Sequence, residues 1–491
     1  MGRTGEEGDN GPFELAFALD NPWRLGLLEL DHFLRRAPGG GRVVDYSTTV
    51  AVASFQRPLS AGEIETYQRQ LGGVQKIAVV HEFIPREVFD AAFPAELEDP
   101  SRFQYGRREL KRALKRLVER VVDPKPPKRR GFVATSFYPA RFGGSTKDRG
   151  KHVLKFLNDA AAKVLEKTRG LKVASFRYPK KAVETGNVEP LSPRGVLKHD
   201  LLDPYGVRAD LFYAETVGGL YLAHTHAVTD LDFFKALERD RPSKLVKNYS
   251  TGVARSLVTF ATARAWEADG GRTNKRTLRV LDPFCGDGKI VALLALLNHS
   301  IYASDASADA IEATRTNLKW FWSNLMELDP PNLGARRLVR CSPTRLDEYF
   351  PPVTFDAVVT WPRLLPRYEE KPSSADLRKA VKEVAEPTVA QFLEKAATVV
   401  KPGGRIVFTT PRVHAREGKA VGLNVPRLLP RSLEVVPPLD PFRLPRPSGT
   451  LRPSIPATFE TRVRLGRRGA VVDVEAWILE KRGEEAQTKT F

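Results

Sequence analysis

The segment DPFCGDGK, residues 282–289, lies between a short apolar run and the helical run IVALLALLN. Glycines at positions 286 and 288 let backbone amides approach a ligand closely at the carboxyl end of a parallel strand. The next predicted strand, SIYASD, ends at Asp305, about 20 residues further on, where a carboxylate can accept hydrogen bonds from both ribose hydroxyls. Together these features predict a nucleoside site, whereas an isolated G-x-G is more often only a tight turn.

The residues beside the glycines narrow the chemistry of the loop. A P-loop reads G-x-x-x-x-G-K-[ST], and Gly288-Lys289 lacks both that spacing and the hydroxyl, which disfavours a P-loop nucleotidase. We expect Lys289 to cap the loop in solvent, in preference to the alternative that it attracts a cofactor carboxylate. Cys285 is expected to be a small packing residue, because only Lys289 beside it would activate a thiol.

The sequence gives little support for a metal site or for disulfide bonds. The two cysteines, Cys285 and Cys341, cannot form a disulfide framework or complete a zinc site, and they indicate a reducing compartment. His224 and His226 lie two residues apart on a predicted strand and so face one side, yet no third ligand is evident. We expect surface histidines and no metal.

The elements around the loop alternate between strand and helix. RRLVRCS, FDAVVT and RIVFTTP are typical of buried strands, and VAQFLEKAATVV is typical of a helix, ended by KPGG. This pattern predicts an α/β fold with a Rossmann-like, doubly wound sheet. Upstream, the strand-like runs at 13–19, 48–55 and 74–83 alternate with two helical runs, which indicates a small ferredoxin-like domain.

The charge of the chain indicates a polyanionic partner. Lys and Arg outnumber Asp and Glu by 78 to 59, giving a formal net charge of +19, and such an excess attracts nucleic acid. The stretch 102–130 is dense in cations, and it is either an RNA-contacting arm or an ordinary solvated helix with a linker. No window approaches the roughly 18 apolar residues of a membrane helix, and MGRTGEEGDNGPFE has no signal-peptide core, so a cytoplasmic protein is expected.

Several motifs carry a more specific resemblance. DPFCGDG after a strand, an acid that ends the next strand, and KPGGRIVF before a late strand resemble class I methyltransferases that modify amino groups of nucleic acids. LGGVQKI, LSPRGVLKHDLL, YLAHTHAVTDLDFFKALERDRP and TGVARSLVTFA resemble, in order and spacing, the archaeal tRNA guanosine N2-methyltransferases with a THUMP domain. The resemblance runs from about Phe13 to Arg482.

The resemblance implies a domain layout and a set of roles. The implied domains are ferredoxin-like at 1–100, a basic helix and linker at 101–130, THUMP-like and RNA-binding at 131–232, a linker at 233–250 and a Rossmann-like methyltransferase at 251–491. The cofactor would be S-adenosyl-L-methionine, the partner tRNA or another structured RNA, and a small activator subunit is a possible further partner. The amino-acid end of the cofactor would contact Asp282, Phe284, Gly286 and Gly288, backed by the helix at 251–261, and its ribose would contact Asp305.

Two positions depart from the family pattern. The family's catalytic loop is an Asp or Asn, two prolines and an aromatic, whereas this chain has Trp361-Pro362-Arg363 after FDAVVT. Trp361 cannot accept a hydrogen bond from an exocyclic amine, although it can stack on a base, and Arg363 can hold a phosphate. At the end of the third strand the usual acid is absent; Ser342, or Asp347 reaching back from the next helix, would have to read the adenine.

Three functions fit this sequence. The leading one is an RNA methyltransferase that modifies the N2 amine of a guanosine in tRNA. A catalytically silent paralogue that binds RNA is the second, because a fold alone does not fix a function. A DNA amino-methyltransferase is the third, and the THUMP-like half argues against it.

Overall fold

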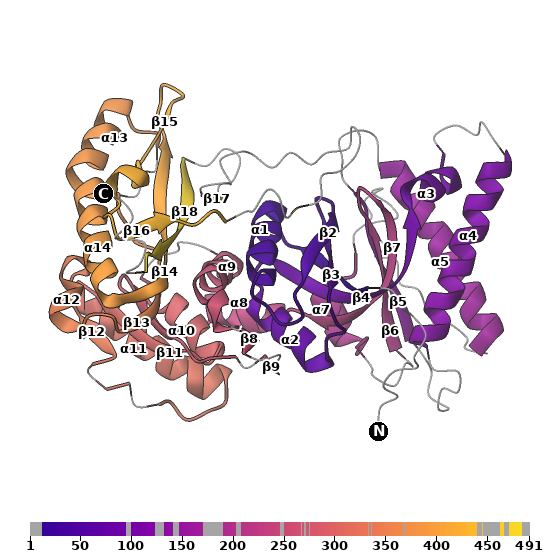
Figure 1. The fold of residues 1–491 in the computed structure, drawn as a ribbon, viewed down its shortest axis with the longest axis horizontal. Helices are drawn as coiled ribbons and strands as arrows, with labels where there is room; N and C mark the ends of the chain where they lie inside the picture. The colour runs from indigo at the N-terminus through magenta and orange to yellow at the C-terminus, as the bar shows by residue number, and fades with distance from the viewer. Residues whose placement is uncertain are drawn as a thin grey trace.

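The computed structural model describes residues 12–94, 100–122, 132–140, 147–169, 190–202, 208–245 and 250–483, the last range with gaps at 267, 270–271, 274, 332, 335, 367, 369, 439–443, 445–461 and 466–470. Two large β-sheets carry helices on their faces, and helices α8 (Leu231–Arg239) and α9 (Thr251–Thr262) lie between the two sheets (Figure 1). The predicted α/β fold class is confirmed. Part of the basic tract, residues 123–130, lies outside the described residues.

The first sheet belongs to the N-terminal half. Within the described ranges it has seven strands, in the order β2-β3-β1-β4-β7-β6-β5. The strands are β1 (Phe13–Leu19), β2 (Arg42–Tyr46), β3 (Val50–Phe55), β4 (Val74–Pro85), β5 (Phe132–Tyr138), β6 (Arg208–Glu215) and β7 (Gly219–Val228). Neighbouring strands run antiparallel except β5 and β6, which are parallel.

Strand β4 joins the two upstream units into one sheet. It pairs with β1 on one side and with β7 on the other, and it is apolar on both faces over Ile77–Val80, as an interior strand must be. The runs expected to be strands at 13–19, 48–55 and 74–83 are strands in the structure, whereas β2 was not predicted. The boundaries between the ferredoxin-like and THUMP-like domains stay a prediction.

Helices cover this sheet. They are α1 (Trp23–Leu34), α2 (Ala61–Gln70), α3 (Arg86–Ala92), α4 (Pro100–Val121), α5 (Lys147–Arg169) and α7 (Pro193–Lys198). Helix α2 begins with a capping box, in which the Ser60 side chain accepts from the backbone of Glu63 and the Glu63 side chain accepts from the backbone of Ser60. Helices α4 and α5 pack on each other at the end of the molecule farthest from the second sheet (Figure 1).

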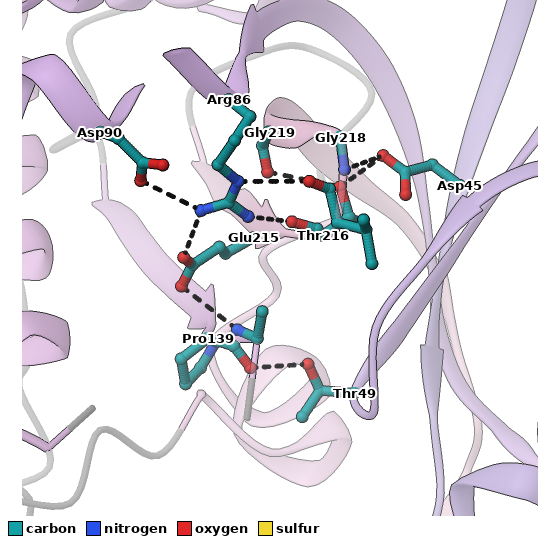
Figure 2. Close-up of polar contacts among 11 residues, drawn as sticks. Asp45, Thr49, Arg86, Asp90, Pro139, Glu215, Thr216, Gly218 and Gly219 are labelled. Carbon is teal, nitrogen blue, oxygen red and sulfur yellow. Dashed lines mark hydrogen bonds and ion pairs between the residues drawn. The ribbon is translucent and has the colours of Figure 1, made fainter. Parts of the chain in front are cut away.

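A polar network ties the β6–β7 turn to its surroundings (Figure 2). The guanidinium of Arg86, at the start of α3, donates to Glu215 at 3.0 Å, to the carbonyl of Val217 at 3.2 Å and to the carbonyl of Thr216. The carboxylate of Asp45, at the end of β2, accepts from the Thr216 hydroxyl at 2.6 Å and from the Gly218 amide at 3.0 Å. Charge-assisted bonds of this kind fix the turn against β2 and α3.

The second sheet has the order β12-β11-β10-β13-β14-β18-β16 in the described part of the chain. Its strands are β10 (Arg279–Asp282), β11 (Ser300–Asp305), β12 (Leu338–Arg340), β13 (Phe355–Thr360), β14 (Val400–His414), β16 (Leu433–Val435) and β18 (Val472–Lys481), with β15 (Ala420–Gly422) and β17 (Val463–Leu465) beside them. The first five strands in this order, β12 to β14, are parallel to one another, and β18 runs antiparallel to both β14 and β16.

The strand order creates a switch point. The chain proceeds outward from β10 to β11 and β12, then returns to form β13 on the other side of β10. The connections after β10 and β13 therefore diverge, and a crevice forms at their carboxyl ends. This order confirms the predicted Rossmann-like, doubly wound sheet.

Helices flank this sheet on both faces. They are α10 (Lys289–Leu296), α11 (Ala308–Trp320), α12 (Leu346–Tyr349), α13 (Ser374–Ala380) and α14 (Glu386–Val399), with π-helical turns at Phe321–Leu325 and Val381–Ala385, 3-10 turns at Ala263–Ala265, Pro343–Arg345 and Val425–Leu428, and a small hairpin of β8 (Ala268–Asp269) and β9 (Arg272–Thr273). No helix in the described ranges is both long and apolar enough to cross a membrane.

Helix α9 joins the two halves. Its buried side chains belong to an apolar cluster that continues from β1 and α1 to β10 and β11. At the same junction the buried carboxylate of Glu29 accepts from the amides of Gly72 and Gly73, at 2.7 and 2.6 Å, and from the Ser256 hydroxyl at 2.8 Å. A buried carboxylate needs such donors, so the turn at LGGVQKI is held against α9 and the two halves share one core.

Candidate active site

The loop between β10 and α10 has the backbone that the glycines predicted. Gly286 and Gly288 have φ angles of 53° and 80°, in the left-handed region that favours glycine. The Cys285 amide donates to the Ser304 carbonyl at 3.0 Å, and the Gly288 amide donates to the Cys285 carbonyl at 2.8 Å. A Cβ atom at Gly286 would meet nothing within 4 Å, so this stretch of backbone faces open space that a ligand can occupy.

Asp305 lies against this loop. One of its carboxylate oxygens accepts from the Gly286 amide at 3.1 Å, and the other accepts from the Ser307 amide at 2.9 Å. Each carboxylate oxygen has two lone pairs, so both can still accept from a ligand hydroxyl. The structure thus brings together the glycine turn and the acid that the sequence paired, and Asp305 also fixes the turn.

Asp282 is buried, with 2% of its surface exposed. It accepts from the Thr360 hydroxyl at 2.6 Å and from the Phe284 amide at 3.3 Å, and among the described residues no cation lies within ion-pair distance of it. Burial raises the pKa of Asp282 to about 7, although these two hydrogen bonds oppose the shift. A carboxylate in this position would be stabilised by a cationic ligand group.

Phe284 shapes the wall of the loop. Its half-buried ring packs on Phe392 of α14 with ring centroids 5.4 Å apart. Cys285 is buried, and it accepts a hydrogen bond from the Thr314 hydroxyl at 3.4 Å. Burial raises the pKa of the Cys285 thiol well above its usual value, which fits the packing role expected for this residue.

The loop Trp361-Pro362-Arg363 follows directly on Thr360, so the Thr360–Asp282 hydrogen bond places it beside the glycine loop. Trp361 is half-buried against the large apolar cluster, Pro362 is buried, and Arg363 is exposed. The structure therefore brings this loop to the crevice at the switch point. The catalytic roles of its three residues stay predictions.

Ser342 lies at the same edge of the sheet, since the preceding Cys341 amide donates to the Asp305 carbonyl at 2.9 Å. The Ser342 hydroxyl caps a 3-10 turn, where it accepts from the Thr344 amide at 3.4 Å and lies 2.8 Å from the Thr344 hydroxyl. The alternative residue, Asp347, forms an ion pair with Lys395 at 2.8 Å. Because the Asp347 carboxylate is engaged by Lys395, Ser342 remains the preferred candidate for an adenine contact.

The expectation that Lys289 caps the loop in solvent is wrong. Its exposed fraction is 5%, and burial, followed by the charge of Arg241, lowers its pKa. The reason lies in the predicted linker at 233–250, which begins inside helix α8 and then covers the start of α10. There Arg241 forms a buried ion pair with Asp287 at 2.6 Å.

Asn317 completes the support of the loop. Its amide nitrogen donates to the Asp287 carbonyl at 2.7 Å and to the Ser243 carbonyl at 2.8 Å, and its oxygen accepts from the Ser243 amide at 2.8 Å. Sequence reasoning missed Thr360, Thr314, Arg241 and Asn317. Only Thr360 had a local indication, because it directly precedes the predicted catalytic loop.

The expectation of surface histidines is also wrong. His224 and His226 are half-buried and line a cavity, and His224 Nδ1 lies 2.8 Å from Nε2 of a third histidine, His81. Strand β4 brings His81 beside β7, which spacing along the chain could not reveal. The described residues hold no cluster of His, Cys, Asp or Glu suited to a metal ion.

A basic groove of about 890 Å³ lies between α4 and α5. Among the described residues that line it there are six cations and no carboxylate: Arg107, Arg108, Lys111, Arg112, Lys115 and Lys163. Arg107 is fixed by aromatic rings, with its guanidinium carbon 4.2 Å from the centroid of Phe156 and 4.5 Å from that of Phe93. Part of the predicted basic stretch is therefore a built cationic groove and not only a solvated helix.

The sheet order, the glycine turn and the acid at the end of β11 define a Rossmann-like α/β protein with a ligand crevice at its switch point. No family model matches the chain. A tRNA (guanine(10)-N2)-dimethyltransferase of Methanothermobacter thermautotrophicus is 27% identical over 179 residues, which are 36% of this chain and 43% of that protein. The chain thus matches less than half the length of this curated relative.

Solved structures show more distant similarity. TrmN from Thermus thermophilus aligns over 95% of this chain and 99% of its own, with 14% identity and a TM-score of 0.44. The N-methyltransferase NodS from Bradyrhizobium japonicum WM9, in complex with S-adenosyl-l-homocysteine, aligns over 51% of this chain and 99% of its own, with 14% identity and a TM-score of 0.29.

Proposed function

We propose that this chain is an S-adenosylmethionine-dependent RNA methyltransferase that modifies the exocyclic N2 amine of a guanosine in tRNA. The observation that carries the proposal is the 2.6 Å hydrogen bond from Thr360 to Asp282. It joins the loop at the end of β13 to the glycine loop at the end of β10, so that a cofactor and a nucleobase can meet at the switch point. The match to a tRNA (guanine(10)-N2)-dimethyltransferase supports the choice of substrate.

The residues of the glycine loop fit this cofactor. The buried Asp282 carboxylate would take the α-ammonium of the methionine moiety, which compensates its burial. The open space at Gly286 admits the cofactor against the backbone, and Asp305 would accept from the ribose hydroxyls. Ser342 would contact the adenine. When bound, S-adenosylmethionine supplies a methyl group on a sulfonium, which an amine nitrogen can attack.

The neighbouring loop would orient the nucleobase. The Trp361 ring offers a face for stacking, and the exposed Arg363 would hold a phosphate next to the target. The guanosine N2 amine is a weak nucleophile, because its lone pair is delocalised into the ring. In this loop a backbone carbonyl is the acceptor that can orient its hydrogens. The proton released after transfer passes to solvent, since none of the side chains of Trp361, Pro362 and Arg363 is a base at neutral pH.

The groove between α4 and α5 would bind the RNA backbone away from the target. Among the described residues, Arg107, Arg108 and Lys111 make no ion pair with a carboxylate, so their charges are available to phosphates. Helices α4 and α5 lie at the end of the molecule farthest from the second sheet, whose strand β10 leads into the glycine loop (Figure 1). An RNA that contacts both must extend along the molecule, as folded tRNA would.

One observation favours a second function. Trp361 occupies the position where an acceptor side chain would orient the amine, and the residues after Arg363 are the buried Leu364 and Leu365. A catalytically silent RNA-binding paralogue would keep the basic groove but would not need to bind a cofactor.

Cofactor affinity separates the two functions. We would titrate S-adenosylmethionine into the full chain by calorimetry, with Asp305→Ala as the test variant and Asp309→Ala, an exposed acid on α11, as the matched control. The enzyme predicts binding that falls at least about tenfold in Asp305→Ala and is unchanged in Asp309→Ala. Binding of tRNA without measurable binding of S-adenosylmethionine would favour the silent paralogue.

A further inference from the structure

A second cavity, of about 860 Å³, lies where the two halves of the molecule meet. It is lined by parts of α2, β7, α8 and α9, and neither the glycine loop nor the loop at 361–363 contributes to it. The proposed methyl transfer therefore leaves this cavity without a role.

Arginines bring positive charge to the cavity. Arg69 of α2 and Arg120 at the end of α4 are exposed, and Arg208 at the start of β6, which pairs with Asp200 at 3.3 Å, also lines it. Two acids among the described residues line the cavity as well. Glu65 forms an exposed ion pair with Arg69 at 3.6 Å, and Asp230 is engaged as the N-cap of α8, where it accepts from the Asp232 and Phe233 amides at 3.0 Å. The balance of charge favours an anionic ligand group.

Arg255 adds a buried positive charge. Its exposed fraction is 5%, and its Nη2 donates only to backbone carbonyls, those of Gln68 and Arg69 at 2.9 and 3.1 Å. Its Nε has no hydrogen-bond partner, and burial lowers its pKa to about 10. An anion bound nearby would relieve the cost of this buried cation.

Gln68 presents a buried acceptor at the cavity wall. Its amide nitrogen donates to the Val74 carbonyl at 2.9 Å and to the Thr229 hydroxyl at 2.7 Å, which fixes the orientation of the amide. Its oxygen is buried and has no partner. Leaving such an acceptor unsatisfied is unfavourable, so a ligand N–H that reaches it would be stabilised there.

Flat rings complete the lining. Phe233 and Phe234 line the cavity from α8, with the Arg255 guanidinium 4.1 Å from the Phe234 centroid. His224 of β7 also lines the cavity, and its ring stacks on that of His81 with ring centroids 5.0 Å apart. Burial lowers the pKa of His224 to about 3 and that of His81 to about 4. Both imidazoles are therefore neutral at physiological pH, and the His224 ring offers a stacking surface in the cavity.

We propose that this cavity binds a single nucleotide, with the base against the Phe233, Phe234 or His224 ring, the Gln68 oxygen on a base N–H, and the phosphate on Arg69 and Arg120. Aromatic faces, a fixed acceptor and arginines at the mouth are the groups that recognise an unpaired nucleotide. The nucleotide can come from a free mononucleotide or from an unpaired position of an RNA. The RNA source rests on the proposed function, whereas the binding chemistry does not.

The test compares nucleotides with nucleosides. The four nucleoside 5′-monophosphates and the corresponding nucleosides are titrated into the full chain by calorimetry. The same is done for Arg69→Ala/Arg120→Ala and for the control Arg378→Ala/Lys382→Ala, two exposed cations near α13. We expect at least one monophosphate to bind about tenfold more tightly than its nucleoside, and this difference to vanish only in Arg69→Ala/Arg120→Ala.

A second experiment distinguishes a free nucleotide from a nucleotide that belongs to an RNA. Binding of a hairpin RNA with a short single-stranded extension, at either end, is compared with binding of the same hairpin without it. If the extension strengthens binding to the parent but not to Arg69→Ala/Arg120→Ala, the nucleotide comes from RNA. Monophosphate binding without an effect of the extension assigns a free nucleotide. The proposal is overturned if neither probe distinguishes Arg69→Ala/Arg120→Ala from the parent, and methyl transfer enters neither readout.

Discussion

The hydroxyl of Thr360, the last residue of β13, donates a 2.6 Å hydrogen bond to the carboxylate of Asp282, the last residue of β10. This contact crosses the switch point of the sheet and joins the two loops that the sequence singled out. It also holds a buried carboxylate whose pKa is raised to about 7 by burial. The proposed cofactor site is therefore sensitive to pH near neutrality.

The substitution Asp282→Asn should stabilise the folded protein and weaken the binding of the cofactor. Because the pKa of Asp282 in the fold, about 7, exceeds the ordinary value of 3.8, its protonation stabilises the fold fully below about pH 4, and that stability is lost as the pH rises through 7. The amide keeps an acceptor for Thr360 without the buried charge. We expect thermal unfolding at pH 8 to show a gain of about 1–3 kcal/mol, which shrinks toward pH 4.

The same carboxylate sets the pH dependence of cofactor binding. An ammonium group binds the ionised form, so the affinity for S-adenosylmethionine should rise by up to about tenfold per pH unit toward pH 7 and then level off. In Asp282→Asn the affinity should be lower and independent of pH over this range. A parent protein whose affinity does not change between pH 5.5 and 7 would contradict the role of Asp282.

Gly288→Ala should deform the glycine loop. Gly288 has a φ of 80°, and an added Cβ would lie 3.0 Å from the Thr314 side chain. We expect about 1–3 kcal/mol of destabilisation together with weaker cofactor binding, measured by thermal unfolding and calorimetry. Gly62→Ala is the matched control, since a Cβ there meets nothing within 4 Å; its helix should gain up to about 1 kcal/mol.

Removal of two groove cations should weaken RNA binding through electrostatics. For Arg108→Ala/Lys111→Ala we expect a lower affinity for tRNA and a plot of log affinity against log salt that is shallower by about 1–2. Both residues line the groove between α4 and α5, whereas the control Arg378→Ala/Lys382→Ala lies near α13. Equal salt slopes in the two double variants would place the RNA elsewhere.

Trp361 tests how the nucleobase is held. If its ring stacks on the base, Trp361→Ala should raise KM for tRNA and leave cofactor affinity unchanged, with a loss of about 1–3 kcal/mol. Trp361→Phe should restore most of the loss, because it keeps an aromatic face. A Trp361→Asp/Arg363→Pro variant that transfers methyl groups faster than the parent would show that the missing acceptor, not the stacking, limits the reaction.

The doubly wound sheet, the glycine turn and the position of Asp305 were predictable, because each follows from local pattern and strand order. The support around them was not. Arg241 and Asn317 lie 46 and 30 residues from the loop residue Asp287 that they contact, and no local pattern indicates such pairs. The prediction that Lys289 is exposed was wrong for the same reason, since residues that surround it come from the stretch 233–250, which was predicted to be a linker.

The single upstream sheet and the cavity beside it likewise could not be predicted from the sequence. The long apolar run of β4 predicts a buried strand, but only the pairing of β4 with both β1 and β7 shows that two units share one sheet. That pairing brings His81 beside His224, and the spacing of His224 and His226 gave no indication of this third ring.

The most direct test of the central claim is transfer of labelled methyl from S-adenosylmethionine to unmodified tRNA by the full chain, with the modified nucleoside identified by mass spectrometry. Our account predicts N2-methylated guanosine, lost in Asp305→Ala and retained in Asp309→Ala. No transfer, by a preparation that binds both tRNA and S-adenosylmethionine, would contradict the proposed enzyme.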